Sequence, residues 1–122
     1  MVDDQRHIFG RWGESEAALF LEGQGLSILE RGFRCRFGEI DIIAQEGQIL
    51  VFCEVKTRRR ETFGAPQEAV SWTKQRRLIK TAGWYLNQRF WDGGLRFDVI
   101  AILASTREKP RLEWIRDAFA WE

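Results

Sequence analysis

Residues 38–56 contain two apolar runs, rich in β-branched and aromatic side chains, that are separated by the polar pair Glu46 and Gly47. A turn signal between two such runs is typical of a tight β-hairpin. A loop centred between Glu46 and Gly47 predicts that Ala44 lies opposite Ile49, which fixes the register of the two strands. Both faces of the hairpin are apolar near the turn, so we expect a layer of structure on each side of it.

Three charged residues share one face of this hairpin: Asp41 on the first strand, and Glu54 and Lys56 on the second. In the predicted register, Asp41 and Glu54 are diagonal neighbours with Cβ atoms roughly 5.5–7 Å apart, and Lys56 lies one pleat further on. Two carboxylates beside an ammonium suit a hard divalent cation next to a phosphate. The simpler interpretation is a structural salt bridge from Lys56 to Glu54 or to Asp41.

A helix expected over residues 13–23 carries one acid on its apolar stripe. At about 100° per residue, Ala17, Ala18 and Leu21 fall within roughly 60° of Glu14. An acid aimed at the sheet needs a partner, and a shared cation is one candidate. The alternative is an acid that is favoured by the positive end of the helix dipole.

The rest of the chain shows the patterns of further strands and of one long helix, for which Ser71 is a suitable cap. Arg96 and Asp98 lie on one face of a strand and are expected to pair, although Asp98 can also support the ion site from behind. Residues 1–12 show no clear period, and we expect them to form a mobile leader. Strands are further expected over residues 26–30, 95–103 and 111–115, an extended, half-exposed segment over residues 33–37, and a short helix over residues 66–70.

A length of 122 residues, 44% of them hydrophobic and 30% charged, is typical of one globular domain, here residues 1–122. No apolar run is long enough to cross a bilayer and the N-terminus lacks a signal-peptide pattern, so we expect a cytoplasmic protein without a membrane partner. Cys35 and Cys53 form no CxxC pair and are interpreted as reduced thiols. Because His7 is the sole histidine, a histidine triad and a histidine zinc cage are excluded.

The net charge of +1 is low for a protein that binds nucleic acid, but the basic residues are clustered. Eight of the 19 Lys and Arg residues fall within residues 56–80, beside the candidate ion site. Lys74 lies on the apolar stripe of its helix and either extends to solvent or turns toward a substrate phosphate. A solvated charged surface is the alternative interpretation of the cluster. We expect the contacts with nucleic acid to come from Arg58, Arg59, Arg60, Lys74 and Arg77.

Asp41, followed by Glu54, Val55 and Lys56 on the next strand, resembles the metal-binding core of the PD-(D/E)xK nuclease superfamily. A closer resemblance, to the YraN-like bacterial family, runs from about residue 13 to the C-terminus. It rests on the motifs Gly38-Glu39-Ile40-Asp41, Glu54-Val55-Lys56-Thr57-Arg58, Phe63-Gly64 and Arg96-Phe97-Asp98-Val99. The resemblance implies an α/β, restriction-endonuclease-like fold with a mixed central β-sheet flanked by helices, and a distant relationship to archaeal Holliday-junction resolvases.

The favoured hypothesis is a metal-dependent endonuclease that hydrolyses phosphodiester bonds in DNA. One or two Mg²⁺ or Mn²⁺ ions would be held by Glu14, Asp41, Glu54 and the Val55 carbonyl. Lys56 would orient the attacking water or stabilise the developing negative charge. The resemblance to junction resolvases suggests branched DNA as the substrate and a homodimer as the active form. The alternatives are a nucleic-acid-binding module without turnover and a structural domain whose charges form internal ion pairs.

Overall fold

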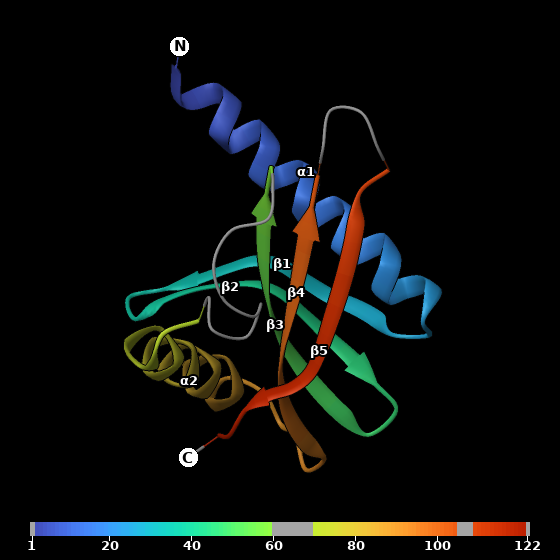
Figure 1. Ribbon diagram of the computed structural model, residues 1–122. Helices are drawn as coiled ribbons and strands as arrows, with labels where there is room; N and C mark the ends of the chain where they lie inside the picture. The colour runs from blue at the N-terminus through green and yellow to red at the C-terminus, as the bar shows by residue number, and fades with distance from the viewer. Residues whose placement is uncertain (1, 60–69, 105–108, 122) are drawn as a thin grey trace.

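The computed structural model describes residues 2–59, 70–104 and 109–121 of the chain. Two helices and five strands lie in these ranges (Figure 1). In chain order they are α1 (Val2–Gly23), β1 (Ser27–Cys35), β2 (Gly38–Glu46), β3 (Ile49–Arg58), α2 (Trp72–Asn87), β4 (Gly94–Leu103) and β5 (Arg111–Phe119). The short helix expected over residues 66–70 falls almost entirely outside the described residues.

The five strands form one sheet in the order β1-β2-β3-β4-β5. Neighbouring strands are antiparallel except β3 and β4, which run parallel because the chain crosses over between them through α2. The two helices cover opposite faces of the sheet (Figure 1). The expected α/β fold, a mixed central sheet flanked by helices, is therefore confirmed, and its architecture is of the restriction-endonuclease-like type.

Each face of the sheet has its own hydrophobic core. On the α1 side, Leu21 packs in one cluster with Val51, and on the α2 side, Leu78 packs in another with Phe52. Because side chains alternate along a strand, adjacent residues of β3 contribute to different cores. A strand that is covered on both sides needs apolar residues on both faces, which explains the continuous apolar run in the sequence.

The register of the β2–β3 hairpin differs from the prediction by two residues. Glu46 pairs with Ile49 and Ala44 pairs with Val51, so the prediction that Ala44 lies opposite Ile49 is wrong. The loop consists of the two residues after Glu46 and begins at Gly47, which adopts a φ of 56° that favours glycine. Because the shift is an even number of residues, the side chains opposite each other still share a face.

α1 begins at Val2, whereas the apolar pattern predicts a helix only over residues 13–23. Residues 2–12 therefore extend the same helix and do not form a separate leader. α2 begins as predicted, since the side chain of Ser71 caps it by accepting a hydrogen bond from the Lys74 N–H. Among the described residues, no helix is both long and apolar enough to cross a membrane.

The predicted strands are present. β1 joins the strand expected over residues 26–30 to the extended segment expected from residue 33, because its ladder with β2 runs as far as Cys35. β5 continues past the expected end at residue 115 to Phe119. Phe119 pairs with Phe97 of β4, and the two rings stack with their centroids 4.8 Å apart. Cross-strand contacts of this kind depend on the partner strand and are not visible in the local pattern.

Candidate active site

The candidate site lies toward the carboxyl end of β3, where β2 separates from it. The backbone ladder between the two strands extends as far as the pair Ile42 and Cys53. Beyond that pair, Oδ2 of Asp41 accepts a hydrogen bond from the N–H of Val55 at 2.8 Å. The Asp41 carboxylate thus lies against the segment of β3 that carries Glu54.

Side chains of β2 depart from strict alternation at Asp41. Ile42 packs in the core on the α1 side, whereas Ile40 packs with Ile43 in the core on the α2 side. Regular alternation would place Ile40 and Ile42 on the same face. We infer that the backbone twists locally at Asp41 and that this twist lets its carboxylate reach the backbone of β3.

Glu54 is the most buried of the predicted site acids, with 5% of its surface exposed. Its Oε2 atom lies 2.5 Å from Nζ of Lys74 and 3.3 Å from Nζ of Lys56. Lys56 belongs to the same strand, whereas Lys74 reaches Glu54 from α2. The salt bridge between Lys56 and Glu54 that the sequence left open is therefore present, and Lys74 adds a second cation to it.

The acids of the site crowd negative charge around Asp41. Burial is the main cause that raises the pKa of Asp41 to about 8, and repulsion from Glu54 is the next. The hydrogen bond from the Val55 N–H acts in the opposite direction, while Glu14 and Glu39 raise the pKa further. An acid with this pKa is mostly protonated at neutral pH unless a cation compensates its charge.

The two lysines are perturbed in opposite directions. Burial lowers the pKa of Lys56, and the neighbouring ammonium of Lys74 lowers it further, against the attraction of Glu54. For Lys74, burial acts to lower the pKa, but the hydrogen bond to Glu54 helps to raise it above its usual value. Lys74 is thus the lysine that Glu54 stabilises as a cation, and Lys56 is the one that loses its proton more readily.

Gly13 brings α1 against the end of β3. A Cβ atom added to Gly13 would lie 2.1 Å from Oγ1 of Thr57, so a side chain here requires a displacement. The next residue, Glu14, is half-buried, and its pKa is raised by burial first and also by repulsion from Glu54. Glu14 therefore faces the same acidic region from the helix, as expected for the acid on its core-facing stripe.

Replacing Gly13 with alanine should lower the free energy of unfolding by about 1–3 kcal/mol, because the methyl group pushes α1 away from Thr57. Gly10→Ala is the matched control, since Gly10 lies in the same helix and a Cβ there would meet nothing within 4 Å. That control should stabilise the protein by up to about 1 kcal/mol through helix propensity. Urea unfolding measures both, and equal stabilities of the two variants would contradict a close packing of α1 on β3.

The described residues contain no group of three or more His, Cys, Asp or Glu side chains close enough to hold a metal ion. Glu14, Asp41 and Glu54 thus form no closed ligand cage; Asp41 and Glu54 come together, and Glu14 faces them from α1. Carboxylate oxygens, with the Val55 carbonyl, are nevertheless the donors that Mg²⁺ and Mn²⁺ prefer. A cation bound here would also offset the repulsion between the Asp41 carboxylate and the neighbouring acids. In donor chemistry the residues fit a hard divalent ion, once the Glu54 carboxylate is released from Lys74.

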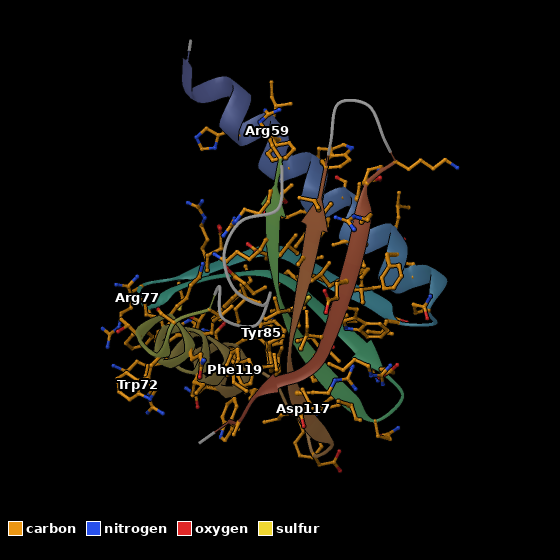
Figure 2. All side chains as sticks on the ribbon, viewed as in Figure 1. Arg59, Trp72, Arg77, Tyr85, Asp117 and Phe119 are labelled. Atoms are coloured by element: carbon orange, nitrogen blue, oxygen red, sulfur yellow. The ribbon has the colours of Figure 1, made fainter. Side chains whose placement is uncertain are left out.

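The basic residues predicted to contact nucleic acid do not share one surface. Arg58 and Arg59 are exposed at the end of β3, whereas Lys74 is directed inward to Glu54. Figure 2 shows Arg59 beside α1 and Arg77 well away from it, on the exposed side of α2. Arg60 belongs to the same predicted set and lies outside the described residues.

Asp98 belongs to a buried network that joins β4 to β5. Its carboxylate accepts hydrogen bonds from Nε and Nη2 of Arg96 at 2.8 and 2.9 Å, from Nε1 of Trp114 at 2.8 Å and from the N–H of Asp117 at 3.0 Å. Arg96 also donates to Glu46 at 2.8 Å. The expected pair of Arg96 and Asp98 is confirmed. These bonds direct Asp98 to the β5 side of the sheet, which gives no support to its suggested role behind the ion site.

The ion pair between Lys74 and Glu54 is the main feature that sequence reasoning missed. A signal for it exists, because Lys74 lies one turn before Leu78 on the core-facing stripe of α2, and a cation there needs an acid opposite it. The sequence of α2 does not show which acid pairs with Lys74, since Glu54 lies on a different element. Packing of α2 on the sheet is what brings the two residues together.

The central hairpin of this chain carries two acids and a lysine at its end, and it belongs to a mixed sheet with a helix on each face. This combination places the chain in the PD-(D/E)xK nuclease-like class of proteins. A family model described as "Uncharacterised protein family UPF0102" matches residues 13–102. The chain belongs to this family, the YraN-like group that its motifs resemble.

Relatives named UPF0102 protein are similar over most of both chains. One from Geotalea daltonii is 52% identical over 111 residues, which cover 90% of this chain and 87% of the relative. One from Geobacter sulfurreducens is 48% identical over 113 residues, covering 92% and 88%. One from Rhodococcus opacus is 46% identical over 112 residues, covering 90% and 94%.

Proposed function

We propose that this protein is a metal-dependent endonuclease that hydrolyses phosphodiester bonds in DNA. The observation that carries the proposal is the hydrogen bond from the Val55 N–H to Asp41, which holds an acid of β2 against the segment of β3 that bears Glu54 and Lys56. Two acids beside a lysine are the groups needed to hold a hard cation at a phosphate and to stabilise the charge that develops there. The family model itself carries the description "uncharacterised", so the proposal depends on these residues.

Asp41, Glu54 and the Val55 carbonyl, together with Glu14, would hold Mg²⁺ or Mn²⁺. Such an ion supplies an activated water and neutralises charge on the phosphate. The Val55 N–H orients the Asp41 carboxylate at 2.8 Å, so this acid need not be ordered when a ligand arrives. Lys56 has a lowered pKa and is suited to orient a water or to donate to the developing negative charge.

Lys74 is proposed to alternate between two anions. It neutralises Glu54 from α2 at 2.5 Å, which lowers the cost of burying that carboxylate. When Glu54 turns to other ligands, the Lys74 ammonium becomes available to a substrate phosphate, the role that the sequence suggested. Arg58 and Arg59 would hold the phosphate backbone without reading bases, which favours selection by DNA structure. Branched DNA and a homodimer are proposed from the resemblance to junction resolvases.

Incubation with single-stranded, duplex, flap and four-way-junction DNA, in Mg²⁺ or Mn²⁺, tests the proposed activity. We expect cleavage of at least one substrate, which EDTA abolishes and which Glu54→Gln lacks because the charge is removed at constant shape. Asp92→Asn, at an exposed acid after α2, is the matched control and should cut like the wild type. Absence of cleavage of every substrate by the folded protein would contradict the proposal.

A nucleic-acid-binding module without turnover is the second candidate. The observation that favours it is the double neutralisation of Glu54 by Lys56 and Lys74, which holds that carboxylate without any metal ion. Such a module would bind the same DNAs and would leave all of them intact. The cleavage panel above, combined with a binding measurement, separates the two candidates.

Replacing Arg58 and Arg59 together with alanine should weaken DNA binding and flatten its salt dependence, by up to about 0.9 for each phosphate that is no longer neutralised. Both side chains are exposed, and Arg59 also lies over the Phe9 ring, so the free energy of unfolding should change by no more than about 1 kcal/mol. Binding titrations between low and physiological salt measure the slope. An unchanged affinity and slope in the folded variant would show that the two arginines form only a solvated surface.

A further inference from the structure

A small apolar hollow, of about 290 Å³, lies beside the basic end of β3 and is lined by Ile8, Phe9, Trp12 and Arg59. The rings of Phe9 and Trp12 are parallel within 9°, with centroids 5.8 Å apart. The guanidinium carbon of Arg59 lies 4.4 Å from the centroid of the Phe9 ring. Ile8 remains 56% exposed. The hollow therefore combines aromatic, aliphatic and guanidinium surfaces that are open to solvent.

The hollow lies on the first turns of α1, which extend past the end of the sheet. Figure 1 shows that α1 projects beyond the carboxyl end of β3. Trp12 packs against the core on the α1 side, while Phe9 lies one turn nearer to the N-terminus. Phe9 lies outside that core, but with Ile8 and Trp12 it forms one contiguous apolar surface, which is the kind of surface that marks a binding site.

The hollow and the candidate active site are carried by the same two elements, at short spacings along the chain. Arg59 follows Lys56 by three residues, roughly 10 Å along an extended chain. Phe9 precedes Glu14 by five residues on α1, roughly 7.5 Å along the helix axis. A strand of nucleic acid with one phosphate near Lys56 can therefore reach the hollow with a nearby base.

The chemistry of the hollow suits a nucleobase. Aromatic rings and the guanidinium plane of arginine are surfaces on which unstacked bases bind, independently of sequence. The volume is at the lower end of the roughly 300–1,000 Å³ range of ligand pockets, which suits a single flat ring system. The positive charges of Arg58 and Arg59 complement the phosphates on either side of such a base. A base inside a duplex is already stacked on its neighbours, so only an unpaired base can enter.

We propose that the hollow lined by Ile8, Phe9, Trp12 and Arg59 binds an unpaired nucleobase. Combined with the proposed nuclease function, on which this part rests, it assigns the substrate class: DNA with a single-stranded segment next to the scissile phosphate, such as a flap or an open branch point. Continuous duplex DNA would leave the hollow empty.

Binding of two oligonucleotides of equal length, one normal and one with abasic sites in its central segment, tests this proposal in EDTA. Phe9→Ala should bind the normal single strand about 5- to 150-fold more weakly than the wild type and should bind duplex DNA equally. The affinity of the wild type should fall by a similar factor on the abasic strand. The affinity of Phe9→Ala should not fall further on that strand, because removing the bases and removing the Phe9 ring abolish the same stacking interaction. Phe9→Tyr keeps an aromatic ring and should restore the binding of the normal single strand. Arg59→Lys keeps the positive charge but lacks the planar guanidinium group, so it should weaken this binding.

Phe90→Ala is the matched control and should have no effect, because Phe90 is a 90% exposed aromatic residue that lies after the end of α2. Unchanged single-strand binding by Phe9→Ala, an equal loss on duplex DNA, or a change in oligomeric state on sedimentation would overturn the proposal. The last outcome would identify a second copy of the chain as the occupant. Cleavage that proceeds without any effect of Phe9→Ala overturns this inference alone, whereas binding that depends on Phe9 without cleavage overturns only the nuclease.

Discussion

Replacing Asp41 with asparagine should make the metal-free protein more stable at neutral pH. The carboxylate is surrounded by other acids, and its pKa is raised from 3.8 to about 8 by burial and then by Glu54. At about 1.4 kcal/mol per pH unit, the interval between 3.8 and pH 7 sets a ceiling of about 4–5 kcal/mol on the stabilisation at neutral pH. The gain should be smaller than the ceiling, because part of the Asp41 side chain is in contact with solvent. The amide oxygen of asparagine can still accept the hydrogen bond from the Val55 N–H.

The same substitution should remove most of the pH dependence of stability. Between pH 3.8 and about 8, the folded protein retains a proton on Asp41 that the unfolded chain has released. The stability of the wild type therefore falls as the pH rises through this window, and it levels off above about pH 8. Urea unfolding in EDTA from pH 5 to pH 9 measures both curves. An asparagine variant that is less stable than the wild type throughout would identify Asp41 as a structural partner.

Replacing Asp98 with alanine should lower the free energy of unfolding by about 3–5 kcal/mol, which corresponds to a fall of about 10–20 °C in melting temperature. The side chain of Asp98 is fully buried and accepts two hydrogen bonds from Arg96. Without it, the buried guanidinium retains only its bond to Glu46, and the Trp114 and Asp117 N–H groups lose their acceptor. Leaving a buried charge without its partner is the costly part of the change.

Asp92→Ala is the matched control for the Asp98 variant, because Asp92 is an exposed acid a few residues earlier in the chain. Its effect should stay within about 0.5 kcal/mol. Thermal unfolding of both variants at one pH gives the comparison. A loss below about 1 kcal/mol for Asp98→Ala would mean that the network does not hold β5 to β4. Cleavage activity at a temperature well below the transition should be retained, because the bonds of Asp98 lead away from Asp41 and Glu54.

The approach of Asp41 to Glu54 was predictable because the two acids lie on neighbouring strands of one hairpin. The faces of Glu54 and Lys56 follow from a period of two, whereas β2 departs from that period at Asp41, which the sequence does not show. The register itself was wrong because the sequence does not show which residues flanking Gly47 form the loop. The positive φ of Gly47 decides this, and it is a property of the folded backbone.

Contacts between distant elements could not be predicted in the same way. The ion pair of Lys74 with Glu54 could not be predicted, because the packing of α2 is what brings the Lys74 stripe over β3. The close approach of Gly13 to Thr57 and the reach of Arg59 over Phe9 likewise depend on how α1 crosses the end of the sheet. Local patterns predict the elements, but the pairing of charges and rings between them follows from the tertiary structure.

Calorimetric titration with Mn²⁺ at pH 7, in two buffers of different ionisation enthalpy, tests most directly whether Asp41 and Glu54 form a cation site. We expect saturable binding by the wild type with release of about one proton, because Asp41 is mostly protonated at this pH and must ionise to become a ligand. Asp41→Asn should bind far more weakly without releasing that proton, while Phe90→Ala should bind like the wild type. No binding by the folded wild type, or equal binding and proton release by Asp41→Asn, would contradict the proposed metal-dependent mechanism.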